Sequence, residues 1–293
     1  MDPHLLRTFV AVIDHRSFSA AAQALGYTQS AVSQHIAALE ADLGTRLVER
    51  RPVGPTESGG RLMEHARPLL LRLDAARADI VGLHGIRPGR LAVACAPGTV
   101  TPAFAGALAR VRRAEPGLST TVQVLGRDAV LRAVMTGEAD LGLVDGIAAP
   151  SDPLPLPDTG PMTTLALAEG PLAVLLPLGH PLAGRRALRL PDLADAHWLD
   201  APDTAVPLSQ LRAAAQTDGF RRGASYAGTD LAGLGTLVAS GHGLAVLASA
   251  TAAALPDTIA VPVSAPRLVH RTEALHPRRT TTATRSLLAA LGG

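Results

Sequence analysis

The stretch from Ser17 to Arg51 constrains the fold most, because it has the pattern of two short helices, a tight turn between them and a basic segment after them. Gly26 ends the first helix, since glycine readily takes the left-handed conformation found at helix ends. Thr28 can cap the second helix by accepting a backbone N–H. An apolar stripe follows at helical spacing, formed by Val32, Ile36, Leu39 and Leu43. The stretch therefore predicts a helix-turn-helix with one buried face.

The opposite face of the second helix is small and polar, whereas an ordinary solvated helix face carries Glu and Arg. A slim face of this kind can enter the major groove of DNA and hydrogen-bond to base edges. Arginines follow where phosphates or a minor groove would lie. Two short helices are also common in ordinary helical cores, which is the alternative interpretation. The predicted DNA-contacting residues are Thr28, Gln29, Ser30, Ser33, Gln34, Arg46, Arg50 and Arg51.

Many residues of this segment match one known pattern in order: Phe9, Ser17, Phe18, Ser19, Ala21, Ala22, Leu25, Thr28, Gln29, Ser30, Val32, Ser33, Ile36, Leu39, Glu40, Leu43, Gly44, Leu47, Arg50, Thr56 and Gly59. The run resembles the winged helix-turn-helix of LysR-type transcriptional regulators. It departs from that family at Val48, where Phe is usual, and at Gln34, where Arg is frequent. The resemblance implies a DNA-binding domain over residues 1–58.

A long helix is predicted from Thr56, which can cap it, to about His84, covering the linker at residues 59–84. We expect a bend at Pro68, because proline removes a backbone hydrogen bond. A heptad seam predicts a coiled coil between two chains; the alternative is a helix lying on its own domain. In the family this helix pairs two subunits, and the resemblance implies a homotetramer. The seam consists of Leu62, Ala66, Leu69, Leu73, Ala76, Ile80 and Leu83.

After a hinge at residues 85–89, strands and helices alternate, which predicts parallel sheets with helices on both faces. We expect two lobes, lobe I at 90–162 and 268–293 and lobe II at 163–267, with the first crossing near Thr163. This half resembles the LysR-type effector domain, which is similar to type II periplasmic binding proteins. The predicted fold class is multi-domain, α and α/β. The resemblance is carried by Gly89–Leu91, Glu115–Pro116, Gly137–Leu141, Gly179–Leu182, Leu190–Leu193 and Gly241–Ala245.

Loops at the carboxyl ends of strands collect ligand contacts in folds of this type. Thr99 and Thr101 follow the first strand, where a helix N-terminus suits an anion, although Thr101 is equally suited to plain capping. Arg127 is suited to pairing with an anion or to solvating a loop, and Asp128 is expected to cap its helix. The predicted effector-binding residues are Thr99, Thr101, Gly126, Arg127, Asp203, Thr204 and Asp230.

Composition and missing motifs exclude several other classes. The net charge is only +2, so DNA affinity has to come from the placement of arginines. The single cysteine, Cys95, excludes an internal disulfide and falls in an apolar strand, which predicts a buried structural thiol. No signal peptide and no membrane-length apolar run are present, so we expect a cytoplasmic protein. His180 has no nucleophile or base beside it and is expected to stabilise a turn. No catalytic residue, metal ligand or cofactor is predicted.

The prediction for function is a LysR-type transcriptional regulator, not an enzyme. Its partners are double-stranded promoter DNA, a small-molecule effector in the cleft of the C-terminal domain, and further copies of the chain. The alternative is a cytoplasmic small-molecule-binding protein or enzyme that uses the same two-lobed α/β fold. That alternative needs neither the basic wing nor the heptad helix. The effector, the operator and the direction of regulation stay open.

Overall fold

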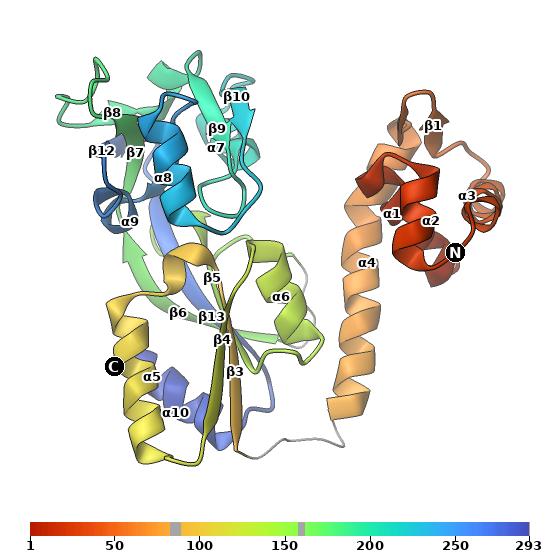
Figure 1. The fold of residues 1–293 in the computed structure, drawn as a ribbon, viewed down its shortest axis with the longest axis horizontal. Helices are drawn as coiled ribbons and strands as arrows, with labels where there is room; N and C mark the ends of the chain where they lie inside the picture. Colours follow the sequence, from red (N-terminus) through yellow and green to blue (C-terminus); the bar gives the residue numbers. More distant parts are fainter. Residues whose placement is uncertain (83–88, 158–161, 293) are drawn as a thin grey trace. The chain divides into compact units, whose positions relative to one another are not determined.

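The computed structural model describes residues 1–82, 89–157 and 162–292, which form two units that we describe separately. The N-terminal unit reaches Ile80. Thr28 caps α3 by accepting the N–H of Ala31 at 3.2 Å, and Gly26 ends α2 with a φ of +69°, both as predicted. Its elements are α1 (Pro3–His15), α2 (Phe18–Leu25), α3 (Gln29–Leu43), β1 (Val48–Arg50), β2 (Val53–Pro55) and α4 (Glu57–Gly82) (Figure 1).

The apolar stripe of α3 packs against α1 and α2 to form the core of this unit. Val32, Ile36 and Leu39 are buried together with Phe9. The prediction is wrong for Leu43, which is 39% exposed. Leu43 is the last residue of α3, and Gly44 then turns the chain with a φ of +67°. The buried stripe therefore ends one turn earlier than its spacing suggested.

Helix α4 begins as predicted, because the Thr56 hydroxyl accepts the N–H of Gly59 at 3.0 Å. The helix continues through Pro68 to Gly82, and the predicted end at His84 lies outside the described residues. The seam divides into two parts. Leu62 and Ala66 pack on α1 of the same chain, as the alternative interpretation required. The later positions that the structure describes are exposed, with 46% for Leu69, 37% for Leu73 and 63% for Ile80, while Leu83 lies outside the described residues.

Lobe I of the C-terminal unit is a five-stranded sheet in the order β4-β3-β5-β13-β6. Helices α5 and α10 pack together on one face and α6 covers the other (Figure 1). The elements are β3 (Arg90–Cys95), α5 (Pro102–Ala114), β4 (Ser119–Val124), α6 (Arg127–Met135), β5 (Leu141–Ala148), β6 (Met162–Gly170), β13 (Val269–Pro277) and α10 (Thr282–Gly292), with a short 3-10 helix at Pro97–Thr99.

Two expectations for this lobe are wrong. The sheet is mixed, because β13 runs antiparallel to both β5 and β6. The first crossing follows Gly170 and not Thr163, since the whole of β6 pairs with β13. The chain returns to this sheet between the end of β12 at Ala265 and the start of β13 at Val269. Residues 158–161 of the proline-rich loop lie outside the described residues.

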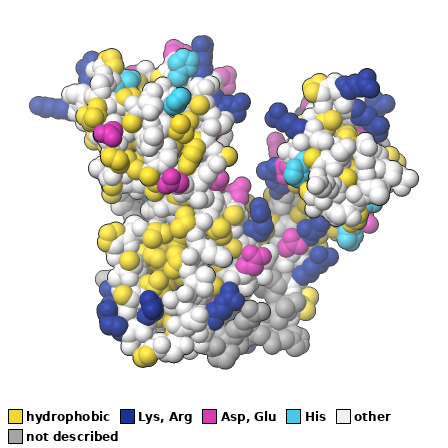
Figure 2. All heavy atoms as spheres, in the orientation of Figure 1, with side chains coloured by type: hydrophobic (Ala, Val, Ile, Leu, Met, Phe, Trp, Pro, Cys, Tyr) yellow, Lys and Arg dark blue, Asp and Glu magenta, His cyan; other side chains and the backbone are white. Residues whose placement is uncertain are grey.

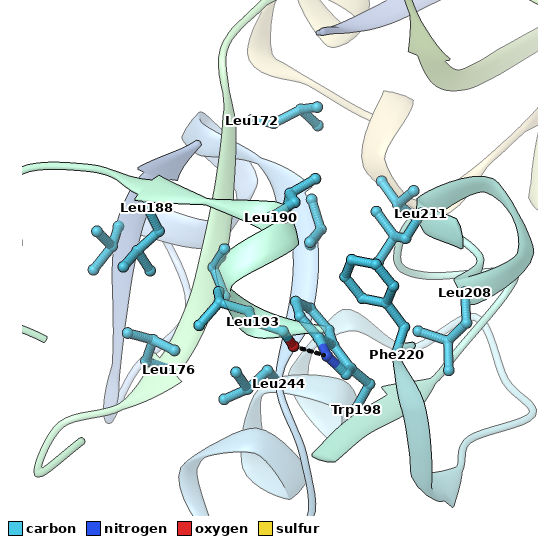
Figure 3. Packing of buried hydrophobic residues seen from close by; sticks show 14 of the residues in the cluster. Leu172, Leu176, Leu188, Leu190, Leu193, Trp198, Leu208, Leu211, Phe220 and Leu244 are labelled. Atoms are coloured by element: carbon cyan, nitrogen blue, oxygen red, sulfur yellow. Dashed lines mark hydrogen bonds between the residues drawn. The ribbon is translucent and has the colours of Figure 1, made fainter. Parts of the chain in front are cut away.

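Lobe II contains a four-stranded sheet, β11-β7-β12-β8, and a parallel pair, β10-β9. Its core centres on Trp198 and Phe220, whose rings lie 5.1 Å apart, and the Trp198 indole N–H donates to the Leu193 carbonyl at 3.0 Å (Figure 3). The elements are β7 (Leu172–Pro177), β8 (Leu188–Arg189), a 3-10 helix (Leu190–Leu193), β9 (His197–Asp200), α7 (Leu208–Ala215), β10 (Arg221–Ser225), α8 (Leu231–Ala239), β11 (Ala245–Ala248), α9 (Ser249–Ala253) and β12 (Thr258–Ala265).

Candidate nucleic-acid interface and interlobe site

The outer face of α3 is exposed and carries the polar side chains that the sequence placed there. Gln29, Ser30 and Gln34 are exposed, and Ser33 is half-buried on the flank. Thr28 is also exposed, and its hydroxyl lies 3.0 Å from the hydroxyl of Ser30. The N-cap of α3 is thereby linked to the first turn of this face. In Figure 2 the surface of the N-terminal unit over α3 is largely uncharged. This face is slim and able to donate and accept hydrogen bonds.

The wing places basic side chains beside that face. Arg46, Arg50 and Arg51 are exposed, and basic side chains gather over the β1 end of the unit in Figure 2. The Arg50 guanidinium carbon lies 5.8 Å above the centre of the Phe18 ring, within cation–π range. This contact holds a wing arginine against the first turn of α2.

A carboxylate ties the wing to α3, and the sequence interpretation assigned it no role. One oxygen of Glu40 accepts the N–H of Leu47 at 2.8 Å and of Val48 at 3.2 Å. The exit of α3 is thereby bonded to the start of β1. Glu40 belongs to the matched family pattern, which was the available signal. Its hydrogen-bond partners, Leu47 and Val48, could not be predicted from the sequence periodicity, because they depend on the tertiary structure.

A second feature missed by the sequence interpretation lies on the flank of α3. The His35 Nδ1 atom is 3.0 Å from the hydroxyl of Thr8 in α1, and Thr8 is fully buried. The same hydroxyl donates to the His4 carbonyl at 3.0 Å. The rings of Tyr27 and His35 meet edge to face, with centroids 5.3 Å apart. His35 therefore connects α3 to α1.

Arg127 bridges the two lobes of the C-terminal unit and is not a free anion ligand. Its Nε donates to the Asp145 carboxylate at 2.9 Å and to the Asp145 carbonyl at 3.1 Å. One terminal nitrogen donates to the carbonyls of Pro202 and of Ala205, the latter at 2.9 Å. The other terminal nitrogen lies 3.4 Å from the second Asp145 oxygen. Since all three nitrogens already have protein acceptors, we correct the prediction that Arg127 pairs with an anionic ligand.

Asp145 is the centre of this bridge. It is 6% exposed, and its second oxygen lies 3.0 Å from Nε2 of the buried His270 in β13. Burial alone would raise the pKa of this carboxyl. The hydrogen bond from His270 and the charge of Arg127 outweigh burial and hold the pKa below its usual range. Asp145 is therefore a buried carboxylate that keeps its charge because it is paired.

The other predicted ligand residues fall into two groups. Gly126 and Asp203 meet across the lobes, since a Cβ at Gly126 would lie 2.2 Å from an Asp203 carboxylate oxygen. Beside them Thr204 is buried, and its hydroxyl has no hydrogen-bond partner. The second group has local roles. Thr99 donates to the Ala96 carbonyl at 2.8 Å, while Thr101 caps α5 and Asp230 caps α8. Gly126, and not Asp128, is the N-cap of α6.

Two minor expectations, for His180 and Cys95, are confirmed. Nδ1 of His180 accepts the N–H of Leu182 at 3.2 Å, which stabilises the turn. Cys95 is buried, and burial raises its pKa to about 11 against an opposing hydrogen bond with Thr99.

Within residues 1–82, 89–157 and 162–292, no three His, Cys, Asp or Glu side chains gather as a metal site would require. No helix in that part of the chain is long and apolar enough to cross a membrane.

Comparison with known proteins gives two family matches that together span most of the chain. Residues 3–60 match the bacterial regulatory helix-turn-helix protein, lysR family. Residues 84–292 match the LysR substrate binding domain. A solved structure, full-length BenM, superposes with a TM-score of 0.54 at 24% identity, covering 99% of this chain and 95% of that one, which supports the fold.

Curated relatives agree with these matches. A probable hydrogen peroxide-inducible genes activator of Mycobacterium avium is 36% identical over 192 residues, or 65% of this chain and 59% of that protein. The match therefore spans less than two thirds of that relative. The HTH-type transcriptional regulator CysL of Bacillus subtilis is 26% identical over 245 residues, covering 83% of this chain and 79% of CysL. The predicted family and fold class are confirmed. The chain belongs to the LysR family of bacterial transcriptional regulators, with an N-terminal helix-turn-helix and a C-terminal LysR substrate-binding domain.

Proposed function

We propose that this LysR-family regulator reads duplex promoter DNA in the bacterial cytoplasm with the outer face of α3, and that a small molecule held between its lobes changes the outcome. The observation that carries the proposal is the exposed, uncharged face of Ser30 and Gln34 beside three exposed wing arginines. Side chains of this kind hydrogen-bond to base edges, while arginines bind DNA phosphates and so fix the position of the protein on the duplex. A free-standing ligand-binding protein would need neither.

The test is binding of the full chain to a labelled duplex from the region upstream of its own gene, compared with a scrambled duplex of equal length. We expect tighter binding to the upstream duplex, and affinity for both that falls steeply as salt is raised. Equal affinity for the two duplexes at every salt concentration would contradict sequence reading. Absence of binding to either would overturn the proposed function.

The two types of contact predict different mutant effects. Arg50→Ala should weaken binding to both duplexes by a similar factor, about 3- to 10-fold. It should also make the slope of log affinity against log salt concentration less steep by about 1, which is the contribution of one phosphate contact. Gln34→Ala should instead change the ratio between the two duplexes, because a base contact is worth about 1–3 kcal/mol of discrimination. Fluorescence anisotropy at several salt concentrations measures both. The assignment is wrong if the two variants behave like the parent chain.

We propose further that the exposed part of the α4 seam pairs two chains. A groove of about 290 Å³ lies between α1 and α4, beside the seam residues Leu69 and Leu73. Large exposed apolar side chains next to an apolar groove are typical of an interface. A two-fold dimer of this kind presents two copies of α3 to two half-sites. A homotetramer, implied by the family, is the larger assembly we expect. The groove is lined by Met1, Pro3, Leu6, Leu69, Arg72 and Leu73.

Leu73→Glu is expected to convert the dimer to a monomer, because it puts a carboxylate into the apolar seam. The change should also weaken operator binding at least 10-fold, since one half-site is then read alone. His65→Glu is the matched control: His65 is an exposed α4 residue outside the seam. Sedimentation velocity gives the oligomeric state. If Leu73→Glu sediments like His65→Glu, α4 does not pair the subunits through this seam.

For the effector we propose the junction between the lobes, where Gly126 faces Asp203 and the Thr204 hydroxyl is buried without a partner. An unsatisfied buried hydroxyl is costly unless a ligand bonds to it. The Mycobacterium avium relative is named for a response to hydrogen peroxide. Thiol oxidation is not our proposal here, because Cys95 is the single cysteine and its pKa is raised to about 11. Peroxide reacts with thiolates, and redox-sensing cysteines are exposed and have a low pKa.

A further inference from the structure

We propose that His35 is a protonation-dependent phosphate contact, so that DNA binding takes up a proton at the flank of α3. The inference rests on the proposed DNA-binding function and adds a residue and a pH dependence to it. It begins from the hydrogen bonds of Thr8. A hydroxyl has one proton, and Thr8 gives its proton to the His4 carbonyl. We therefore assign the acceptor role towards His35 to this hydroxyl, and the proton between the two groups to Nδ1.

This bond decides what the other ring nitrogen does. With Nδ1 protonated, Nε2 of the neutral ring is an acceptor, which a phosphate oxygen repels. Protonation of the ring leaves the bond to Thr8 intact and turns Nε2 into a charged donor. The change therefore costs no internal contact. It converts Nε2 of His35 from an acceptor to a phosphate-binding group.

The position of His35 fits a contact to the DNA backbone. It follows Gln34 and is turned about 100° from it around the helix, towards α1. It is partly exposed, and the neighbouring Tyr27 is 43% exposed. A helix whose outer face lies in the major groove has its flanks against the phosphates on either side. The ring of Tyr27 meets the ring of His35 edge to face and limits its rotation.

Several titratable and charged groups lie on the elements around His35. On α1, His4 and His15 lie on the same stripe as Thr8, and both are exposed. Beyond His4, the Asp2 carboxylate is bonded to the His4 N–H at 2.7 Å. Further along α3, Asp42 pairs with the amino group of Met1 at 3.1 Å. Tyr27 is a further titratable neighbour, since its ring contacts that of His35. His4 and His15 also carry imidazole rings, and both lie on α1, so they supply the controls.

The test compares the affinity for the upstream duplex at about pH 6 and about pH 8, at constant ionic strength. The parent chain should bind about tenfold tighter at the lower pH, because a protonated donor is required. His35→Asn keeps a donor near the Nδ1 position for Thr8 but cannot become charged. Its affinity should stay close to the parent value at the higher pH and change little with pH. His4→Asn and His15→Asn should keep the pH dependence of the parent.

A second measurement does not depend on any variant folding. Calorimetric titration of the parent chain with the duplex, in two buffers of different ionisation enthalpy, counts the protons taken up. Net uptake at about pH 7 that disappears in His35→Asn supports the inference. No uptake by the parent chain, or equal uptake by His35→Asn, overturns it. If the parent chain binds no duplex at either pH, the proposed DNA-binding function itself fails.

Discussion

Gly59→Ala is expected to destabilise the N-terminal unit by about 3 kcal/mol or more and to abolish DNA binding. A Cβ at this position would lie 2.0 Å from the carbonyl oxygen of Leu47 and 3.3 Å from the Cβ of Pro55. The oxygen it meets is backbone, and it already accepts the N–H of Thr56 at 3.0 Å. No side-chain rotation relieves the overlap. The first turn of α4 would therefore have to move away from the wing.

The neighbouring glycine is a matched control. A Cβ at Gly60 meets no atom within 4 Å, and Gly60 lies in the same helix. Gly60→Ala should therefore stabilise the unit by up to about 1 kcal/mol, the usual preference of a helix for alanine. Urea unfolding followed by circular dichroism reports the helices of both units, while fluorescence of the single tryptophan, Trp198, reports lobe II. The transition of the N-terminal unit is therefore the part of the circular-dichroism change that the fluorescence does not follow. Equal transitions for the two variants would contradict the packing described for Gly59.

The local features of the helix-turn-helix were predictable from the sequence, because each depends on neighbours within one helical turn. The cap at Thr28, the end at Gly26 and the buried positions of Val32 and Ile36 are of this kind. Leu43 shows the limit of the method. Periodicity extends a stripe to the last residue of a helix, whereas burial depends on how far the neighbouring helices reach.

Pairings between distant segments were not predictable in the same way. Alternating strands and helices predict parallel neighbours, but β13 enters the sheet between β5 and β6 and runs antiparallel to both. The sequence correctly predicts that Arg127 lies at a strand-to-helix turn, where α6 begins after β4. Its acceptors at Asp145, Pro202 and Ala205 come from segments far along the chain, and no spacing rule connects them.

The Asp145 bridge leads to the prediction with the second large effect. Asp145→Asn should destabilise the C-terminal unit by about 3–5 kcal/mol at neutral pH, because it leaves the charge of Arg127, whose side chain is only 16% exposed, without its counter-charge. Asp192→Asn is the control. The Asp192 carboxylate pairs with Arg189 at 3.8 Å while both side chains are more than 60% exposed, and its loss should cost at most about 1 kcal/mol.

The pH dependence of this effect shows whether Asp145 stabilises the fold through its negative charge or only through its hydrogen bonds. In the folded chain the pKa of Asp145 is lowered, so its charge stabilises the fold above the unfolded-state value of about 3.9. That stabilisation is lost as the pH falls through the lower folded-state pKa. The stability difference between the parent and Asp145→Asn should therefore be largest near neutral pH and shrink progressively below about pH 4. Urea unfolding followed by Trp198 fluorescence at each pH measures it. A difference that stays constant as the pH falls would show that the carboxylate charge does not hold this bridge together.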